Sequence, residues 1–187
     1  MPRIVSRNIL HSTPWMQLIE KEVSLSPIGP SELYYCITQP AYVGVFTQTE
    51  DGRIALVRQY RPCVETHTWE FPGGTVDDGE TPKASAIREV EEETGLRVRE
   101  VIYFGNFHPD TGRLQVDSHA FFVKVSNPDE DTRPEPGIEV RYVTANEFDE
   151  MILSGEFRTQ LDLGIYILAI LHGIDIHVGA LENTSPL

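Results

Sequence analysis

Residues Gly74–Leu96 read GTVDDGETPKASAIREVEEETGL, and the carboxylates of Glu89, Glu92 and Glu93 fall within little more than one helical turn. Helix positions i, i+3 and i+4 share one face, so these like charges repel unless a cation neutralises them. Oxygen ligands without a nearby Cys or His pair favour Mg²⁺ or Mn²⁺ over zinc. The stretch therefore predicts a divalent-metal platform, with a solvated acidic helix face as the alternative interpretation.

The composition describes an ordinary globular chain with a strong negative charge. Its 187 residues are 40% hydrophobic and 24% charged, which suits one domain with a small appendage. The formal net charge of −14 argues against a nucleic-acid partner. A small phosphorylated substrate stays open, because metals and a few Arg residues can invert the charge locally. Cys36 and Cys63 form no CxxC pair, and no apolar run reaches signal-peptide or membrane-spanning length. We therefore expect a soluble, cytoplasmic protein with no membrane partner.

Three regions are expected along the chain: an N-terminal β ribbon at 1–40, a main domain at 41–172 and a C-terminal tail at 173–187. In the ribbon, Met16–Ser24 and Leu33–Thr38 are predicted to pair across the PIGP turn. A two-stranded ribbon is marginal alone, so it should pack on the main domain or on a second subunit.

The main domain alternates predicted strands and helices. The acidic stretch should form a helix with Thr81 as N-cap, Pro82 at its first position and Gly95 just past its end, and Pro72-Gly73-Gly74 should break the preceding strand. Strands are expected at Ala41–Thr47, Arg53–Gln59, Trp69–Phe71, Arg97–Phe107, Ser118–Val125 and Glu139–Val143, and further helices at Ala145–Leu153 and Thr159–His172. This order predicts an α/β fold with a mixed sheet and helices on its faces.

The spacing of Gly74, Glu80, Arg88-Glu89, Glu92-Glu93 and Gly95-Leu96 resembles the Nudix box at every defined position. The resemblance extends over about residues 40–172 and implies the α/β/α Nudix sandwich. It also implies hydrolysis of a nucleoside diphosphate linked to a moiety X, by water attacking phosphorus with the help of divalent metal ions.

The same resemblance assigns roles to residues of the box. Glu89, Glu92 and Glu93 would be metal ligands, with the carbonyl of Gly73 as an added ligand. Arg88 would orient the Glu side chains through an ion pair, and Glu80 would be a supporting carboxylate.

The flanks of the box are similar to those of the ADP-ribose pyrophosphatase branch and its nucleotide-sugar relatives. The matching segments are VRQYRP (Val57–Pro62) and EFPGGTVDDGETP (Glu70–Pro82). A guanidinium can clamp a diphosphate bidentately, so Arg61 is expected to bind the substrate, with a surface salt bridge as its alternative. Arg58 is a weaker candidate, and Glu70 is included in the same substrate-binding set. Pro109 lies nearer to the box than the corresponding Pro usually does in this branch, which puts the ADP-ribose assignment in question.

Members of this branch dimerise through an N-terminal segment and stack the base on its aromatic residues. By that resemblance the chain is expected to be a homodimer, with Trp15 and Tyr34 (or Tyr35) stacking the base. Plain packing in a dimer interface is the alternative. The branch often takes its general base from a mobile loop before the last strand, where Glu135 lies, with Glu139 as second choice.

The sequence thus predicts Mg²⁺-dependent hydrolysis of a nucleoside diphosphate sugar, with ADP-ribose giving AMP and ribose 5-phosphate. A GDP- or UDP-hexose is the alternative substrate. A hydrolase of oxidised nucleoside triphosphates is disfavoured by the ribbon and the EFPGG flank. A catalytically idle nucleotide-sensing module is a different class, and it is disfavoured because no metal-ligand Glu of the box is missing.

Overall fold

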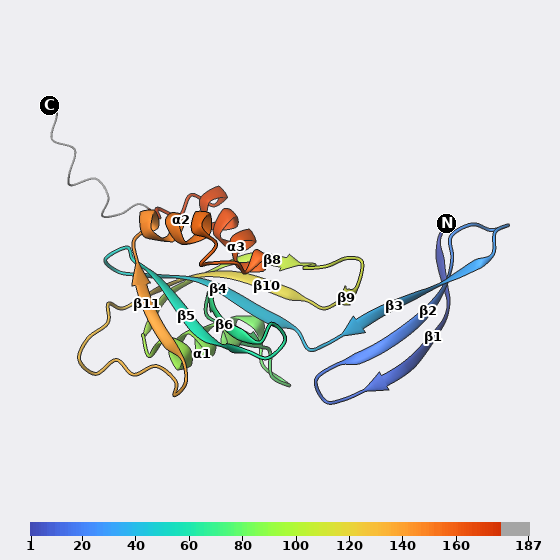
Figure 1. Cartoon of the computed structure of the whole chain (residues 1–187), viewed down its shortest axis with the longest axis horizontal. Helices are drawn as coiled ribbons and strands as arrows, with labels where there is room; N and C mark the ends of the chain where they lie inside the picture. The colour runs from blue at the N-terminus through green and yellow to red at the C-terminus, as the bar shows by residue number, and fades with distance from the viewer. Residues whose placement is uncertain (177–187) are drawn as a thin grey trace, which may run out of the picture.

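The strand β4 (Tyr42–Thr49) lies in the middle of the main sheet and is buried over nearly its whole length. In the computed structural model, which describes residues 1–176, this sheet has seven strands, and its main path is β11-β5-β4-β10-β8 (Figure 1). The partners on this path are β5 (Ile54–Arg61), β8 (Val98–Phe107), β10 (Ser118–Val125) and β11 (Glu139–Val143). Two short strands, β6 (Thr66–Glu70) and β7 (Gly73–Thr75), pair with β5 and β4 respectively. Since β4 and β10 are parallel and the other pairs are antiparallel, the predicted mixed sheet is confirmed.

Helices cover both faces of this sheet. The helix α1 (Pro82–Thr94) packs on one face over an apolar cluster that includes Val43, Val45, Ala86 and Val90. On the other face, α2 (Ala145–Ser154) and α3 (Gln160–Leu171) cover a larger aromatic cluster that includes Phe46, Phe71, Phe122, Phe148 and Tyr166 (Figure 1). The predicted α/β/α sandwich is confirmed. None of the helices among residues 1–176 is long and apolar enough to cross a membrane.

The N-terminal ribbon has more strands than the two that we expected. It contains β1 (Arg3–Ser12), β2 (Gln17–Ser24) and β3 (Ser31–Thr38), and β9 (Leu114–Gln115) adds a fourth strand from the loop between β8 and β10. Register shifts at Ile4/Ser6 and Ile9/His11 interrupt the pairing of β1 with β2. Such irregularities break the two-residue alternation that reveals a strand, which explains why the sequence did not predict β1.

The ribbon projects away from the seven-stranded sheet (Figure 1). Of the expected C-terminal tail, residues 173–176 are described and Ile176 packs into the core beside α3, whereas residues 177–187 lie outside the described part of the chain.

Candidate active site

The helix α1 is terminated at both ends as the sequence predicts. The Thr81 hydroxyl accepts a hydrogen bond from the Ala84 amide at 3.2 Å, Pro82 begins the helix, and Gly95 ends it in the left-handed conformation. Between these caps the apolar side of the helix lies on the sheet, and the carboxylates emerge beside it. The caps therefore set the register that places the box carboxylates.

Arg88 supplies the positive charge that balances the acidic face. Its Nη1 atom lies 2.8 Å from Glu89 Oε1 and 3.2 Å from Glu92 Oε2, while Nη2 lies 3.1 Å from both Glu80 Oε2 and the Thr75 carbonyl oxygen. Hydrogen bonds from Arg88 and from the Ser85 hydroxyl hold the pKa of the Glu80 carboxyl below its usual range. Arg88 is thus placed to orient the carboxylates, as its expected role requires.

Glu93 is the most buried of the three expected metal ligands. Its side chain accepts the Gly73 amide at 2.9 Å on one oxygen and the Gln59 amide at 3.1 Å on the other. The residue is only 5% exposed, and this burial raises the pKa of the Glu93 carboxyl to about 7. The nearby charge of Glu89 acts in the same direction, whereas the hydrogen bond from Gly73 opposes it.

Two glycines allow the box carboxylates to come close to the sheet. Gly73 faces the Val43 carbonyl, where an added Cβ would lie 2.3 Å from the oxygen. At Gly74 an added Cβ would lie 2.2 Å from Glu89 Oε1, so any larger residue would displace that carboxylate. We expected Pro72-Gly73-Gly74 to interrupt the preceding strand. Instead the two glycines form β7, which pairs with β4, and the interruption is confined to Phe71-Pro72. Pairing of the glycine backbones with β4 accounts for the difference.

The donor set fits a hard divalent cation, because it consists of carboxylate oxygens with a backbone carbonyl nearby. In the described residues no three His, Cys, Asp or Glu side chains already converge as a ligand set. Oxygens of Glu89 and Glu92 are turned to Arg88, and those of Glu93 to Gly73 and Gln59. The Glu92 side chain is 55% exposed and therefore has room to turn toward Glu89 and Glu93.

Arg61 forms an ion pair with Glu70, the alternative that the sequence left open. Arg61 Nε lies 2.9 Å and Nη2 2.5 Å from the two Glu70 carboxylate oxygens, and the Thr68 hydroxyl donates to the same carboxylate. The hydrogen bonds to Glu70 raise the pKa of the guanidinium above its already high value. Among residues 1–176, Nη1 of Arg61 has no hydrogen-bond partner, so one edge of the fork is available.

Arg58 and Glu139 lie apart from this cluster. Gln59 and Arg61 contact the buried carboxylates Glu93 and Glu70, whereas Arg58 pairs with Glu139 at 3.0 Å and lies 5.8 Å from the Trp69 ring centroid. Successive side chains of a strand point to opposite faces, so Arg58 is directed away from the carboxylates that Gln59 and Arg61 reach.

Glu135 lies beside the C-terminal part of α1. Its backbone amide donates to the Glu92 carbonyl at 2.9 Å, and its side chain is exposed. The loop before β11 is also pressed against the end of the helix, because Gly95 abuts the Arg133 backbone. The loop that carries the expected general base therefore adjoins the C-terminal end of α1, while Glu139 is paired with Arg58.

The ribbon aromatics are not brought to the cluster of the same chain. Trp15 lies in the turn between β1 and β2 and is 76% exposed, and the Tyr34 hydroxyl donates to Glu32 at 3.2 Å. Within residues 1–176 neither aromatic contacts Glu89, Glu92 or Glu93. Their expected stacking role stays a prediction.

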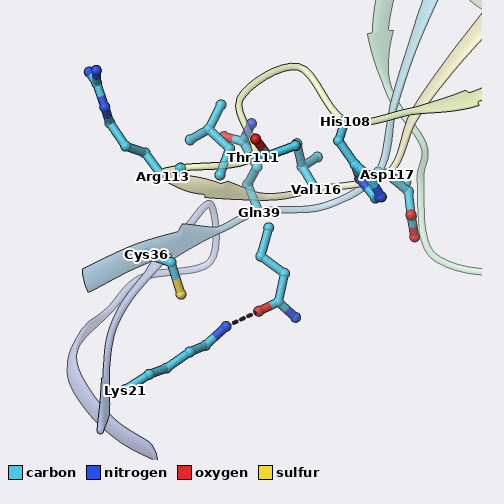
Figure 2. Close-up of a pocket in the computed structure, with 12 residues that line it drawn as sticks. Lys21, Cys36, Gln39, His108, Thr111, Arg113, Val116 and Asp117 are labelled. Carbon is cyan, nitrogen blue, oxygen red and sulfur yellow. Dashed lines mark hydrogen bonds between the residues drawn. The ribbon is translucent and has the colours of Figure 1, made fainter. Parts of the chain in front are cut away.

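A pocket of about 540 Å³ lies between the ribbon and the 108–117 loop (Figure 2). Lys21 Nζ donates to Gln115 Oε1 at 2.7 Å across it, and β3 pairs with β9 beside it. His108 and Asp117 line its other end, while the Arg113 side chain extends away from it (Figure 2). The contacts around this pocket join the ribbon to a loop of the main domain.

Two residues near the carboxylates, Asp162 and Tyr42, were not predicted from the sequence as site residues. Asp162 in α3 is 5% exposed and accepts the Phe71 amide at 2.9 Å, and burial raises its pKa to about 7. Burial also raises the pKa of the Tyr42 hydroxyl, with the charge of Asp162 acting in the same direction. The sequence signal for Asp162 is a lone carboxylate in the apolar run of α3, a segment for which we predicted only a helix.

The chain belongs to the Nudix family. The model of the NUDIX domain matches residues 38–160, and the box, the sandwich and the buried carboxylates agree with it. The chain is therefore a Nudix hydrolase that acts on pyrophosphate bonds, and the expected enzyme class is confirmed.

Three relatives illustrate where the chain falls in the family. It is 30% identical to the CMP-5'-(N-acetyl-N-hydroxy-3-aminopropyl)phosphonate hydrolase of Streptomyces rubellomurinus, over 87% of this chain and 79% of that protein. It is 27% identical to the ADP-ribose pyrophosphatase of Bacillus subtilis, over 82% of this chain and 84% of that one. A shorter match, 36% identical over 44% of this chain and 38% of its relative, is to the ADP-sugar pyrophosphatase of Mus musculus. The similarity to the ADP-ribose pyrophosphatase branch is confirmed.

Proposed function

We propose that this chain hydrolyses the pyrophosphate bond of a nucleoside diphosphate sugar, with ADP-ribose giving AMP and ribose 5-phosphate. The observation that carries the proposal is the buried Glu93, held by Gly73 and Gln59 directly beside Glu89. The choice of a sugar nucleotide as substrate is based on the sequence around Arg61 and Glu70, beside the box. It is also based on two relatives that are named ADP-ribose pyrophosphatase and ADP-sugar pyrophosphatase.

Glu89, Glu92, Glu93 and the Gly73 carbonyl would hold Mg²⁺, with Mn²⁺ as a substitute. Bound there, the metal neutralises phosphate charge and lowers the pKa of the attacking water. Arg88 keeps the Glu89 and Glu92 carboxylates aligned through one ion pair to each. The free edge of the Arg61 guanidinium orients the diphosphate, while Glu70 holds the other edge of the same group.

Glu135 is the proposed general base. It would take a proton from the water as the new P–O bond forms and the bridging P–O bond breaks, so that the second phosphate leaves with the bridging oxygen. The loop position supports this assignment, because the Glu135 backbone is bonded to that of the metal ligand Glu92 and its carboxylate is exposed.

We further propose that the chain acts as a homodimer through residues 1–40. Strand β1 is exposed along almost its entire length, and the large apolar side chains Ile9 and Leu33 are more than half exposed. Exposed apolar side chains on a sheet that projects from its domain favour a covering partner, and a second copy of the ribbon would bury them. The two free cysteines, Cys36 and Cys63, suit the reducing cytoplasm.

A second candidate substrate is a nucleoside monophosphate joined to a phosphonate. The relative from Streptomyces rubellomurinus has such a substrate in its name, and its alignment covers 87% of this chain. The linkage is again a phosphorus anhydride, so the same carboxylates would serve.

A substrate panel distinguishes these candidates. ADP-ribose, a CMP-linked aminoalkylphosphonate, GDP-mannose, UDP-glucose and oxidised dGTP are incubated with Mg²⁺, and the products are separated by ion-exchange chromatography. We expect ADP-ribose to give the highest kcat/KM, and Glu93→Gln to abolish turnover of every substrate. Absence of Mg²⁺-dependent hydrolysis across the panel would contradict the proposal and favour the nucleotide-sensing alternative.

A further inference from the structure

Three contacts tie the end of β6 and the turn after it to the segment that leads into α3. Trp69 and Phe157 form an isolated parallel bridge, and the Thr159 hydroxyl donates to the Trp69 carbonyl at 3.2 Å. The third contact is the hydrogen bond from the Phe71 amide to Asp162 Oδ2, at 2.9 Å. The helix layer thus holds the strand just before the chain enters the box.

Asp162 is an unexpected residue for its position. It lies in the first turn of α3, in the run QLDLGIYILAIL, where its neighbours pack into the aromatic core. Burying a carboxylate is unfavourable unless its oxygens are hydrogen-bonded, and an apolar residue would pack there without that cost. The hydrogen bond from the Phe71 amide is therefore the interaction that indicates a role for this carboxylate.

Only Pro72 separates Phe71 from Gly73, whose amide holds Glu93. Proline restricts the backbone of this link, and its carbonyl accepts the Val45 amide at 2.9 Å. On the other side, Gly73 is paired with Gly44 of β4 and packs so closely that an added Cβ would lie 2.3 Å from the Val43 carbonyl oxygen. The direction of the Gly73 amide therefore depends on where Asp162 holds Phe71.

We propose that Asp162 is a positioning residue of the active site, which fixes the Phe71–Gly73 turn and thereby the geometry in which the Gly73 amide holds the Glu93 carboxylate. Asp162 acts through the turn and does not contact the substrate. This inference rests on the proposed function only for its kinetic readout, since the placement of Glu93 can also be measured by metal binding.

The test compares variants that keep or remove the acceptor for the Phe71 amide. Asp162→Asn keeps an oxygen acceptor, Asp162→Ala removes it, and Asp162→Leu removes it while filling the space. Thr159→Val is the matched control, because it removes one hydrogen bond from the same segment to Trp69, which does not lead directly to Gly73. Dissociation of Mn²⁺ is followed by electron paramagnetic resonance without substrate, and kcat and KM are measured with the best substrate of the panel.

Loss of a residue that orients a metal ligand commonly costs about 10- to 100-fold in metal affinity or activity. We expect Asp162→Ala and Asp162→Leu to weaken Mn²⁺ binding and lower kcat by about these factors, with KM changed less than about threefold. Asp162→Asn should recover most of both losses, and Thr159→Val should match the wild type.

Wild-type Mn²⁺ affinity and kcat in folded Asp162→Ala or Asp162→Leu would overturn the proposal. Failure of both variants to fold would also overturn it, in favour of a purely structural carboxylate. If the wild type hydrolyses nothing in the panel, the proposed function fails, yet the Mn²⁺ measurement still decides the role of Asp162.

Discussion

Arg61 and Glu70 are joined on one edge of the guanidinium only, with Nε and Nη2 bonded to the two carboxylate oxygens. The sequence presented a salt bridge and a phosphate contact as alternatives for Arg61. The pairing makes the two compatible, because Glu70 fixes the plane of the fork while Nη1 remains available to a diphosphate. The Thr68 hydroxyl and the burial of Glu70 keep this arrangement rigid.

Replacement of Arg61 by Lys should raise KM for the nucleoside diphosphate substrate by about tenfold, with a smaller change in kcat. Lysine keeps the charge beside Glu70 but cannot hold a carboxylate and a phosphate in one plane. Steady-state kinetics measure both constants, and Arg53→Lys, in the surface pair with Asp51, is the matched control. An unchanged KM would mean that Arg61 serves Glu70 alone.

Glu135→Gln should lower kcat by about 100-fold while Mn²⁺ binding stays unchanged, because the amide cannot accept a proton from water. Single-turnover kinetics and Mn²⁺ titration separate the two effects. Glu139→Gln is the control, since that carboxylate pairs with Arg58 away from the cluster. Near-wild-type turnover of Glu135→Gln would shift the role of the base to a carboxylate of the box.

Trp15→Ala should raise KM for an adenine-containing substrate more than it lowers kcat. Stacking of a base on an aromatic ring contributes on the order of 1 to 3 kcal/mol in single-strand binders. Trp15 is 76% exposed, and we expect a second copy of the chain to bring it to the base, so the effect should depend on the dimer, which sedimentation velocity measures. A dimeric variant with unchanged KM would sink the stacking hypothesis.

Asp162 should make the metal-free protein less stable as the pH rises from about 4 to about 7. Burial raises its folded-state pKa to about 7 from 3.8, so the folded state holds a proton that the unfolded state has lost in this range. Asp162→Asn should remove this slope and be more stable than the wild type at pH 8, by on the order of 1 to 3 kcal/mol.

Urea unfolding in EDTA at pH 5, 6, 7 and 8 measures this difference. The raised pKa of Glu93 contributes a slope of the same sign, so the comparison must be between wild type and variant and not within the wild type alone. Parallel pH profiles for the two proteins would show that Asp162 is already ionised in the folded state.

Gly95→Ala should destabilise the fold by about 1 to 3 kcal/mol, because φ is +70° and the added Cβ would lie 2.4 Å from the Arg133 carbonyl oxygen. Gly79→Ala is the control, since φ is +83° there but nothing lies within 4 Å of the added atom. Urea unfolding of both variants separates backbone strain from the clash. Equal losses would show that the loop before β11 yields freely at Arg133.

Several features could be predicted from the sequence because their signals are local. The caps of α1 at Thr81 and Gly95 depend on side chains adjacent to the helix, and the box depends on fixed spacing within one element. The dependence on local signals also explains why β1 was not predicted, because its register shifts interrupt the alternation of side chains that a regular strand shows.

The sequence by itself determined the family, the reaction class and the position of the carboxylates on one helix face, since each follows from spacing along a single segment. Only the tertiary structure decided that Gln59 and Gly73 hold Glu93, that Arg58 and Arg61 serve opposite faces of β5, and that Asp162 reaches Phe71. Those contacts join residues far apart in the chain, and their existence depends on how the strands and helices pack together. The residue pattern within a single segment carries no information about contacts with another segment.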